Sequence, residues 1–335
     1  MISSNVDKKV FVVTLGCAKN LVDSEYLVTG LKYIGYSMTS NVNESSIVII
    51  NTCGFLDVAR EESIEKILEI EEKKQDGLID KVIVMGCLAE RYGNELQKEI
   101  PGVDKFFGSE EHEAVIKYIS GKDFNLDDPD IIRASLTPSH YSYLKISEGC
   151  DNACSFCSIP IMRGLQKSQP LRWNVDEAKR LASRGVKELL VIAQDSTLYG
   201  WDANPKTSLH ELFSELDKID GIEWLRLHYA HPSNLHRDMI SHFKNLEKLI
   251  PYIDMPIQHG SDKLLKIMRR GLKSDGIKKK IESLRKANDN IAIRTSIIVG
   301  HPGETDREFK EMLDFISDIQ FDRLGVFQYS HEEGT

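Results

Sequence analysis

Three short apolar runs near the start of the chain each end beside a cysteine, and their regular spacing constrains the fold more than any other feature. The runs are VFVVTLGC, IVIINTCG and KVIVMGC, and their cysteines are Cys17, Cys53 and Cys87. The cysteines are 36 and 34 residues apart, close to the roughly 30 residues or more that a strand, a crossover helix and a second parallel strand require. The repeat therefore predicts a parallel α/β sheet.

The segments between these runs carry apolar residues at helical spacing, which predicts helices over residues 23–33 and 58–73. Strands that are apolar on both faces are typical of parallel sheets covered by helices. Because the carboxyl ends of such strands meet at one edge of the sheet, the three cysteines are expected to lie close together there.

The chain is expected to have two domains joined by a linker. Residues 121–140 are polar and acidic and have no sustained period, so we assign domains to residues 1–120 and 141–335 and a linker between them. The second domain alternates strand-like and helical segments. Six such runs begin at Tyr143, Glu188, Glu223, Tyr252, Ile291 and Arg323. A closed barrel needs eight units, so we expect a partial barrel of six.

Composition narrows the class of protein. The chain has 335 residues, a formal charge of −9 and six cysteines. It contains neither a long uncharged apolar segment nor a secretory signal, which predicts a cytoplasmic protein without a membrane role. In that reducing compartment the cysteines are expected to be metal ligands or reactive thiols rather than disulfides. The acidic charge disfavours a dominant nucleic-acid surface.

The strongest chemical signal is the loop EGCDNACSFCSIP, with Cys150, Cys154 and Cys157 in a C-x3-C-x2-C pattern. A [4Fe–4S] cluster is normally held by four thiolates, so a loop that supplies three leaves one iron open for catalysis. A structural zinc site is the alternative, but it needs four ligands, and no His or fourth Cys lies near the loop. For Cys17, Cys53 and Cys87 the alternative is three buried structural thiols.

The cysteine loop, with Phe156 before its last cysteine, resembles the hallmark of radical S-adenosylmethionine (SAM) enzymes. The resemblance implies that Cys150, Cys154 and Cys157 hold a catalytic cluster whose open iron binds SAM, and that cleavage of SAM yields a 5′-deoxyadenosyl radical. It also implies a SAM pocket at the strand ends. The expected pocket residues are Phe156, Gln194, Asp195, His228, Gln258, Ser261, Arg294 and Gly300. For His228 and Arg294, a structural role is equally compatible with this argument.

The first triplet resembles that of the radical SAM methylthiotransferases. The resemblance implies that Cys17, Cys53 and Cys87 bind a second [4Fe–4S] cluster, whose open iron carries the sulfur to be transferred. It further implies two SAM molecules, one as methyl donor and one as radical source. The open irons of the two clusters are expected to face each other across the substrate.

Within that family, LGCAKNLVDSE at residues 15–25, IPIMRG at 159–164 and AQDSTLYG at 193–200 resemble the RimO type. That type implies methylthiolation of the β-carbon of an aspartate in small-subunit ribosomal protein twelve, an electron donor such as flavodoxin or ferredoxin, and a monomer. The MiaB type, which modifies a tRNA adenosine, and a non-catalytic iron–sulfur electron carrier are the alternatives. The family also has a C-terminal TRAM domain, and the sequence stops before one.

Overall fold

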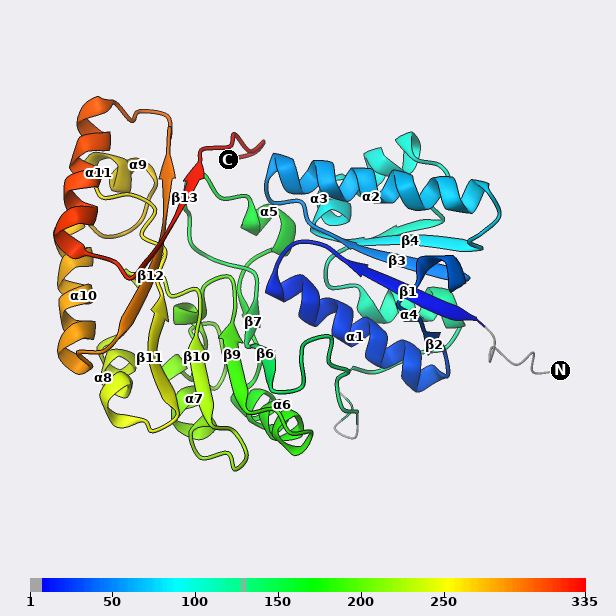
Figure 1. Cartoon of the computed structure of the whole chain (residues 1–335), viewed down its shortest axis with the longest axis horizontal. Helices are drawn as coiled ribbons and strands as arrows, with labels where there is room; N and C mark the ends of the chain where they lie inside the picture. Colours follow the sequence, from blue (N-terminus) through cyan, green and yellow to red (C-terminus); the bar gives the residue numbers. More distant parts are fainter. Residues whose placement is uncertain (1–7, 127, 129–130) are drawn as a thin grey trace. The chain divides into compact units, whose positions relative to one another are not determined.

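The computed structural model describes residues 8–126, 128 and 131–335 (Figure 1). Residues 1–7, 127, 129 and 130, which belong to the expected first domain and linker, lie outside the described part. The chain forms two compact units. The first extends to Leu136 and also includes Ile161–Arg163, and the second comprises Thr137–Pro160 and Gly164–Thr335.

The first unit contains a parallel sheet of five strands in the order β2-β1-β3-β4-β5. Its strands are β1 (Lys9–Thr14), β2 (Ser37–Met38), β3 (Ile47–Thr52), β4 (Lys81–Gly86) and β5 (Lys105–Phe107). The three apolar runs form the adjacent central strands β1, β3 and β4, so the predicted parallel α/β sheet is confirmed. The strands β2 and β5 at the two edges are the additions.

Helices cover both faces of this sheet (Figure 1). They are α1 (Ala18–Ile34), α2 (Asp57–Gln75), α3 (Cys87–Glu99) and α4 (His112–Ser120), with a short 3₁₀ helix η2 (Val42–Glu44). Side chains of α1 and α4 pack with Ile49 and Ile83 on one face, and those of α2 and α3 pack with Val48 and Val82 on the other. Successive strand residues thus point to opposite, equally apolar faces, as expected for a buried parallel sheet.

The described residues of the segment expected to be a linker contain neither helix nor strand and pack largely on the first unit. The Phe124 side chain is buried in the core beside α1 and α4. The backbone N–H of Ala134 donates to the Thr29 hydroxyl at 2.7 Å, and that of Leu136 donates to a Glu25 carboxylate oxygen at 2.8 Å. The boundary between the two units consequently falls after Leu136, so most of this segment belongs to the first unit.

The second unit is built on six parallel strands in the order β13-β12-β11-β10-β9-β6. They are β6 (Tyr141–Lys145), β9 (Glu188–Ile192), β10 (Trp224–Leu227), β11 (Leu249–Asp254), β12 (Ala292–Val299) and β13 (Arg323–Gln328). All six predicted runs are present. The outermost strands β6 and β13 do not pair, so the partial, open barrel is also confirmed.

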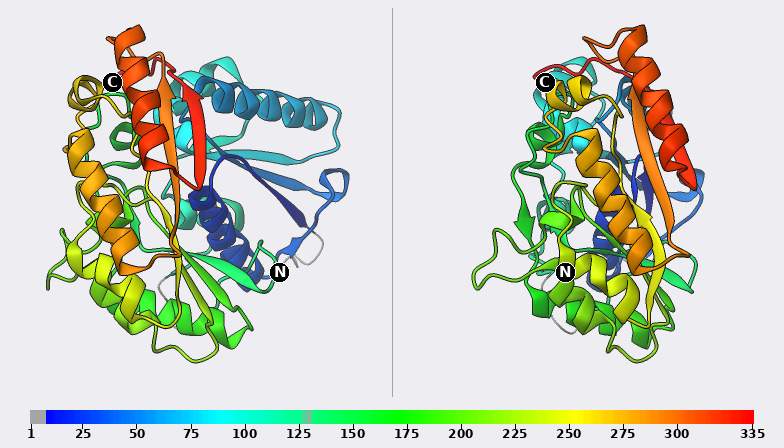
Figure 2. Two further views of the ribbon diagram at one scale, coloured as in Figure 1. Left: turned by 60° about the vertical axis from the view of Figure 1, so that its left-hand side comes forward. Right: turned by 90° about the vertical axis from the view of Figure 1, so that its left-hand side faces the viewer.

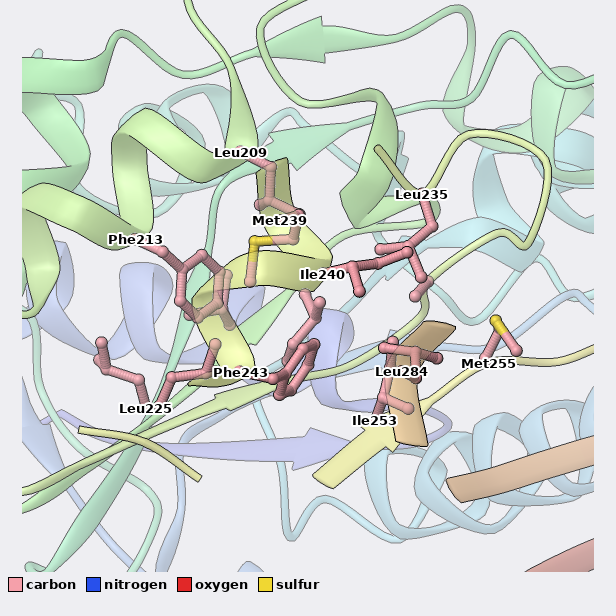
Figure 3. Packing of buried hydrophobic residues seen from close by; sticks show 14 of the residues in the cluster. Leu209, Phe213, Leu225, Leu235, Met239, Ile240, Phe243, Ile253, Met255 and Leu284 are labelled. Carbon is pink, nitrogen blue, oxygen red and sulfur yellow. The ribbon is translucent and has the colours of Figure 1, made fainter. Parts of the chain in front are cut away.

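Five helices pack against the outward-facing side chains of these strands. They are α6 (Leu171–Ser183), α7 (Leu209–Leu216), α8 (Arg237–Asn245), α10 (Ser274–Ala287) and α11 (Asp306–Ile319). Figure 2 shows α10 and α11 running beside β12. Figure 3 shows Phe213 of α7 and Phe243 of α8 among the aliphatic side chains of Leu225 and Ile253. This core leaves the opposite face of the sheet to polar residues such as Asp254 and Arg294.

Short elements at the carboxyl ends of the strands complete the second unit. They are β7 (Ser147–Glu148) and β8 (Lys167–Ser168), which pair antiparallel, η3 (Ser196–Leu198) and α9 (Asp262–Ile267). The short helix α5 (Ile159–Arg163) is divided between the units, since its residues Ile161–Arg163 belong by their contacts to the first. Within the described ranges, none of the helices has the length and apolar character needed to cross a bilayer.

Candidate active site

The first cysteine triplet lies where three adjacent strands end. Cys17 caps the N-terminus of α1 after β1, Cys53 directly follows β3, and Cys87 begins α3 after β4. Cys53 and Cys87 are buried, whereas Cys17 is exposed. The topology therefore brings together three thiols that are far apart in the sequence, at the sheet edge where α/β proteins place ligands.

Asn20 and Gly16 lie among these three thiols. The Asn20 Oδ1 atom is 3.8 Å from the Cys17 sulfur and 4.0 Å from the Cys87 sulfur. A Cβ atom on Gly16 would be 3.0 Å from the Cys53 sulfur and 3.2 Å from Asn20 Nδ2. Gly16 also has a φ of +90°, which disfavours other residues. Glycine is thus required here both by the backbone and by the approach of Cys53.

The second triplet occupies the loop that follows β7. Gly149 has a φ of +72°, and a Cβ atom there would be 2.1 Å from the Leu165 carbonyl oxygen. The Asp151 carboxylate accepts hydrogen bonds from the Gln166 backbone N–H and the Trp201 indole, both at 3.0 Å. These contacts fix both the entry to the loop and its first turn.

A buried carboxylate holds the middle of this loop. Asp195, which follows β9, accepts a hydrogen bond from Asn152 at 2.6 Å and another from Asn234 at 2.9 Å. It also accepts from the Thr197 backbone N–H at 2.9 Å and from the Thr197 hydroxyl. Asn152 in turn lies 3.4 Å from the Cys150 sulfur. Asp195 therefore lies beside the loop, and its oxygens are engaged in positioning it. Its expected role in the SAM pocket stays a prediction.

Each triplet also has a buried arginine that the sequence reasoning did not select. Arg163 Nε donates to the Cys87 sulfur at 3.1 Å, and Arg270 Nη1 donates to the Cys154 sulfur at 3.1 Å. Both side chains are largely buried, with residue exposures of 5%. A guanidinium beside a sulfur favours the thiolate, which is the form that binds metal.

Burial has the opposite effect on the thiols. It raises the pKa of Cys87 to about 11 and that of Cys157 to about 12, and it also raises the pKa of Cys53 and of Cys150. Arg163 opposes the shift at Cys87, and Arg270 opposes it at Cys157. Buried thiols with raised pKa values are poor nucleophiles but lose their protons when they coordinate a metal. The chemistry of both triplets fits ligands better than free reactive thiols.

The donor atoms of the two triplets are compatible with clusters. In the part of the chain that the structure describes, no group of three or more Cys, His, Asp or Glu side chains is arranged to hold one metal ion. Ligands of a structural zinc ion must converge on a single point. The thiolates of a [4Fe–4S] cluster bind different irons and need no such point. An all-sulfur donor set of three, at two sites, is compatible with two such clusters.

Buried polar atoms without a partner surround the second triplet, which is a further sign that a polar group fits there. They are Oγ of Ser155, Oγ of Ser158, Nε of Arg270 and Nε2 of His231. His231 Nδ1 faces Ser233, whose backbone N–H lies at 3.3 Å, so Nε2 carries the proton. Each of these atoms can donate a hydrogen bond, and both the sulfides of a cluster and the carboxylate of SAM can accept one.

Three of the predicted SAM-pocket residues, two at strand ends and one in the cysteine loop, have features that suit a ligand. Gln194 donates from Nε2 to Glu148, while its Oε1 is buried without a partner. The Phe156 ring stands edge-on to His301, the neighbour of Gly300, with ring centres 6.4 Å apart. Gly300 has a φ of +78° and open space where a Cβ atom would be.

The remaining predicted pocket residues make internal contacts. Arg294 Nη1 donates to Asp254 at 2.8 Å, and His228 Nδ1 lies 3.8 Å from the same carboxylate. The Ser261 hydroxyl donates to Glu311 at 2.6 Å. Gln258 has a φ of +74°, and its backbone bonds to Ser296 and Ile298 of β12. Asp254 thus joins His228 to Arg294.

Two protein families match this chain. Residues 9–108 match the family described as "Uncharacterized protein family UPF0004", and residues 144–316 match the Radical SAM superfamily. The first match spans the strands that carry Cys17, Cys53 and Cys87, and the second includes the loop with Cys150, Cys154 and Cys157.

Similar proteins identify the family. The ribosomal protein uS12 methylthiotransferase RimO of Flavobacterium psychrophilum is 49% identical over 329 residues, which cover 98% of this chain and 75% of that protein. RimO of Aquifex aeolicus is 48% identical over 327 residues, again 98% of this chain and 74% of its own length. The chain belongs to the RimO family. It is accordingly an enzyme, a radical SAM methylthiotransferase that uses SAM and two [4Fe–4S] clusters.

Solved structures similar to this RimO-family chain agree on the fold. The radical SAM methyltransferase TsrM of Kitasatospora setae superimposes with a TM-score of 0.71 at 15% identity, over 96% of this chain and 73% of TsrM. The cobalamin-dependent SAM radical enzyme OxsB superimposes with a TM-score of 0.64 at 13% identity, over 92% and 52% of the two chains. At these identities the likeness concerns the fold alone.

Proposed function

We propose that this protein adds a methylthio group to the β-carbon of an aspartate in ribosomal protein uS12. The proposal rests above all on two separate cysteine triplets in a chain that contains only six cysteines. With three thiolates per cluster, each cluster keeps one iron for a ligand that is not a cysteine. The RimO relatives, whose names include uS12, support this protein as the substrate.

The two triplets are assigned separate roles. When bound, the cluster at Cys150, Cys154 and Cys157 supplies the electron that cleaves SAM, and the cluster at Cys17, Cys53 and Cys87 supplies the sulfur. Asp195 and Arg270 position the cysteine loop that would hold the SAM-cleaving cluster, through Asn152 and Cys154. Gln194 Oε1 is suited to accept a hydrogen bond from the amino group of SAM.

Reductive cleavage of SAM consumes an electron, so the enzyme needs a donor, and we propose a small flavodoxin or ferredoxin. A ribosomal-protein substrate would place the reaction in the cytoplasm. The thiols of the described residues are all free, which suits that reducing compartment.

The test is to incubate the reconstituted enzyme anaerobically with SAM, a reductant and either uS12 or tRNA. We expect mass spectrometry to find a methylthio group on one aspartate of uS12 and none on tRNA. Modification of a tRNA adenosine with unmodified uS12 would contradict the proposed substrate and favour the tRNA-modifying alternative.

A further inference from the structure

The Arg163 guanidinium makes three different contacts beside the first cysteine triplet. Its Nε donates to the Cys87 sulfur at 3.1 Å, its Nη1 to Asp23 at 2.9 Å and its Nη2 to the side-chain oxygen of Asn20 at 2.6 Å. Because the guanidinium is planar and its donors point in fixed directions, three partners define its orientation. Arg163 belongs by its contacts to the first unit.

The Asn20 side chain connects Arg163 to the backbone beside the other two cysteines of the triplet. Its Nδ2 donates to the carbonyl oxygens of Leu15 at 2.8 Å and Thr52 at 3.0 Å, next to Gly16 and Cys53. Its Oδ1, which accepts from Arg163, faces the sulfurs of Cys17 and Cys87. The amide therefore cannot rotate without the loss of several buried hydrogen bonds, each of which is costly to leave unmade.

The charge of Arg163 matters because the site is buried. Asp23, its carboxylate partner, is 1% exposed, and Asn20 is fully buried. In such surroundings a nearby positive charge acts strongly on thiolates and on any electron added to a cluster that they bind. Hydrogen bonds to sulfur and net local charge are among the factors that set the reduction potential of an iron–sulfur cluster.

We propose that Arg163 is a positioning residue of the first cluster, holding the Cys87 thiolate and raising the reduction potential of that cluster. The inference rests on the proposed role of Cys17, Cys53 and Cys87 as cluster ligands. Arg270 has the corresponding contact with Cys154 in the other triplet and serves as a matched control.

The test uses the 335-residue chain with Cys150, Cys154 and Cys157 changed to Ala, reconstituted anaerobically with iron and sulfide so that only the first cluster forms. Two changes are made at the arginine in this background. Arg163→Gln is combined with Asp23→Asn so that no buried charge is left unpaired, and Arg163→Lys keeps the charge but not the fork of donors. Arg270→Gln is the control.

Two readouts are recorded: the midpoint potential from an EPR-monitored dithionite titration, and the rate at which a chelator removes iron. We expect a lower potential for Arg163→Gln/Asp23→Asn, because the net charge is unchanged but the Cys87 sulfur loses the hydrogen bond from Nε. For Arg163→Lys we expect about tenfold faster iron loss, the effect typical of lost contacts behind a metal ligand. Arg270→Gln should change neither. If the double variant is too unstable to load, Arg163→Lys decides alone.

Wild-type iron retention by Arg163→Lys, together with a wild-type potential in any double variant that loads, would overturn the role of Arg163. Equal effects of Arg270→Gln would overturn it as well, because they would indicate a non-specific loss of stability. Absence of a cluster in the parent with Arg163 intact would instead contradict the proposed ligand role of the first triplet. The two failures are therefore distinguishable.

Discussion

Asn152, inside the cysteine loop of the second unit, donates a 2.6 Å hydrogen bond to the buried carboxylate of Asp195 at the end of β9. Since Asp195 also accepts from Asn234 at 2.9 Å, one carboxylate ties the loop to two neighbouring segments of the barrel. The loop is thus held by the scaffold before any cluster binds, which lowers the entropy cost of arranging three thiolates.

Asp195→Ala should weaken the second cluster. The change removes the acceptor of several hydrogen bonds, and loss of such supporting contacts typically costs about 10- to 100-fold in metal affinity. Iron retained after chelator treatment should fall at the second site only, as measured in a variant without the first triplet. Asp202→Ala, which removes an exposed carboxylate that binds Ser168, is the control. Equal iron retention by the two variants would be against this role of Asp195.

Gly16→Ala should impair the first cluster. A Cβ atom there would be 2.7 Å from the Cys53 Cβ, so Cys53 has to move. Gly35→Ala is a close control, because its φ of +103° is similarly strained but nothing lies within 4 Å of the added atom. Both variants should lose about 1–2 kcal/mol of stability from backbone strain. Only Gly16→Ala should lose iron from the first site, and equal iron contents would contradict the account.

Two of the predicted SAM-pocket residues should respond differently to mutation. Gln194→Leu removes a buried oxygen that has no protein partner, and we expect the KM for SAM in 5′-deoxyadenosine formation to rise about three- to tenfold. Ser261→Ala should leave this KM unchanged, because the hydroxyl is bonded to Glu311. The reverse result would mean that Ser261, rather than Gln194, contacts SAM.

The cluster-free protein should become less stable at high pH. Burial raises the pKa of Cys87 from 9.0 to about 11, so the folded state holds the thiol proton more tightly than the unfolded state does. This contribution is complete below about pH 9 and is lost as the pH rises through about 11. A shift of this size corresponds to roughly 2–3 kcal/mol.

Denaturant unfolding near pH 8 and near pH 10.5 measures the effect, with Cys87→Ala as the reference for all other titrating groups. We expect the wild type to lose more stability than Cys87→Ala over this interval. A parallel loss in both proteins would show that ionisation of Cys87 is not coupled to folding.

The sequence predicted the elements that are continuous apolar runs. The strands β1, β3 and β4 were found because β-branched residues fill them, and the six barrel strands because strand-like runs alternate with helical segments. The strands β2, β7 and β8 were missed since each has only two residues, too few for a pattern. Helix α1 begins at Ala18, earlier than expected. Its first turns were missed because Asn20 and Asp23 are buried as well as Val22, so the sequence lacks the alternation of polar and apolar faces that marks a helix.

The parts of the site that depend on the spacing of cysteines in the sequence were predictable. The contacts that only the fold creates between distant residues were not. The loop with Cys150, Cys154 and Cys157 is recognisable by its C-x3-C-x2-C pattern. Cys17, Cys53 and Cys87 were expected to lie close together because each follows a predicted strand. Arg163 lies 76 positions from the cysteine that it contacts, and no local pattern marks the contact. Its place in IPIMRG indicated the RimO type but said nothing of a partner.

The most direct test of the central claim, that the two triplets do separate work, is to quantify 5′-deoxyadenosine and methylthiolated uS12 in the same reaction mixtures for Cys53→Ala and Cys154→Ala. We predict that Cys154→Ala forms neither product, and that Cys53→Ala still forms 5′-deoxyadenosine but leaves uS12 unmodified. Each variant should lose about four irons, as the cubane stoichiometry requires. Methylthiolation of uS12 by Cys53→Ala at the wild-type rate would contradict the account.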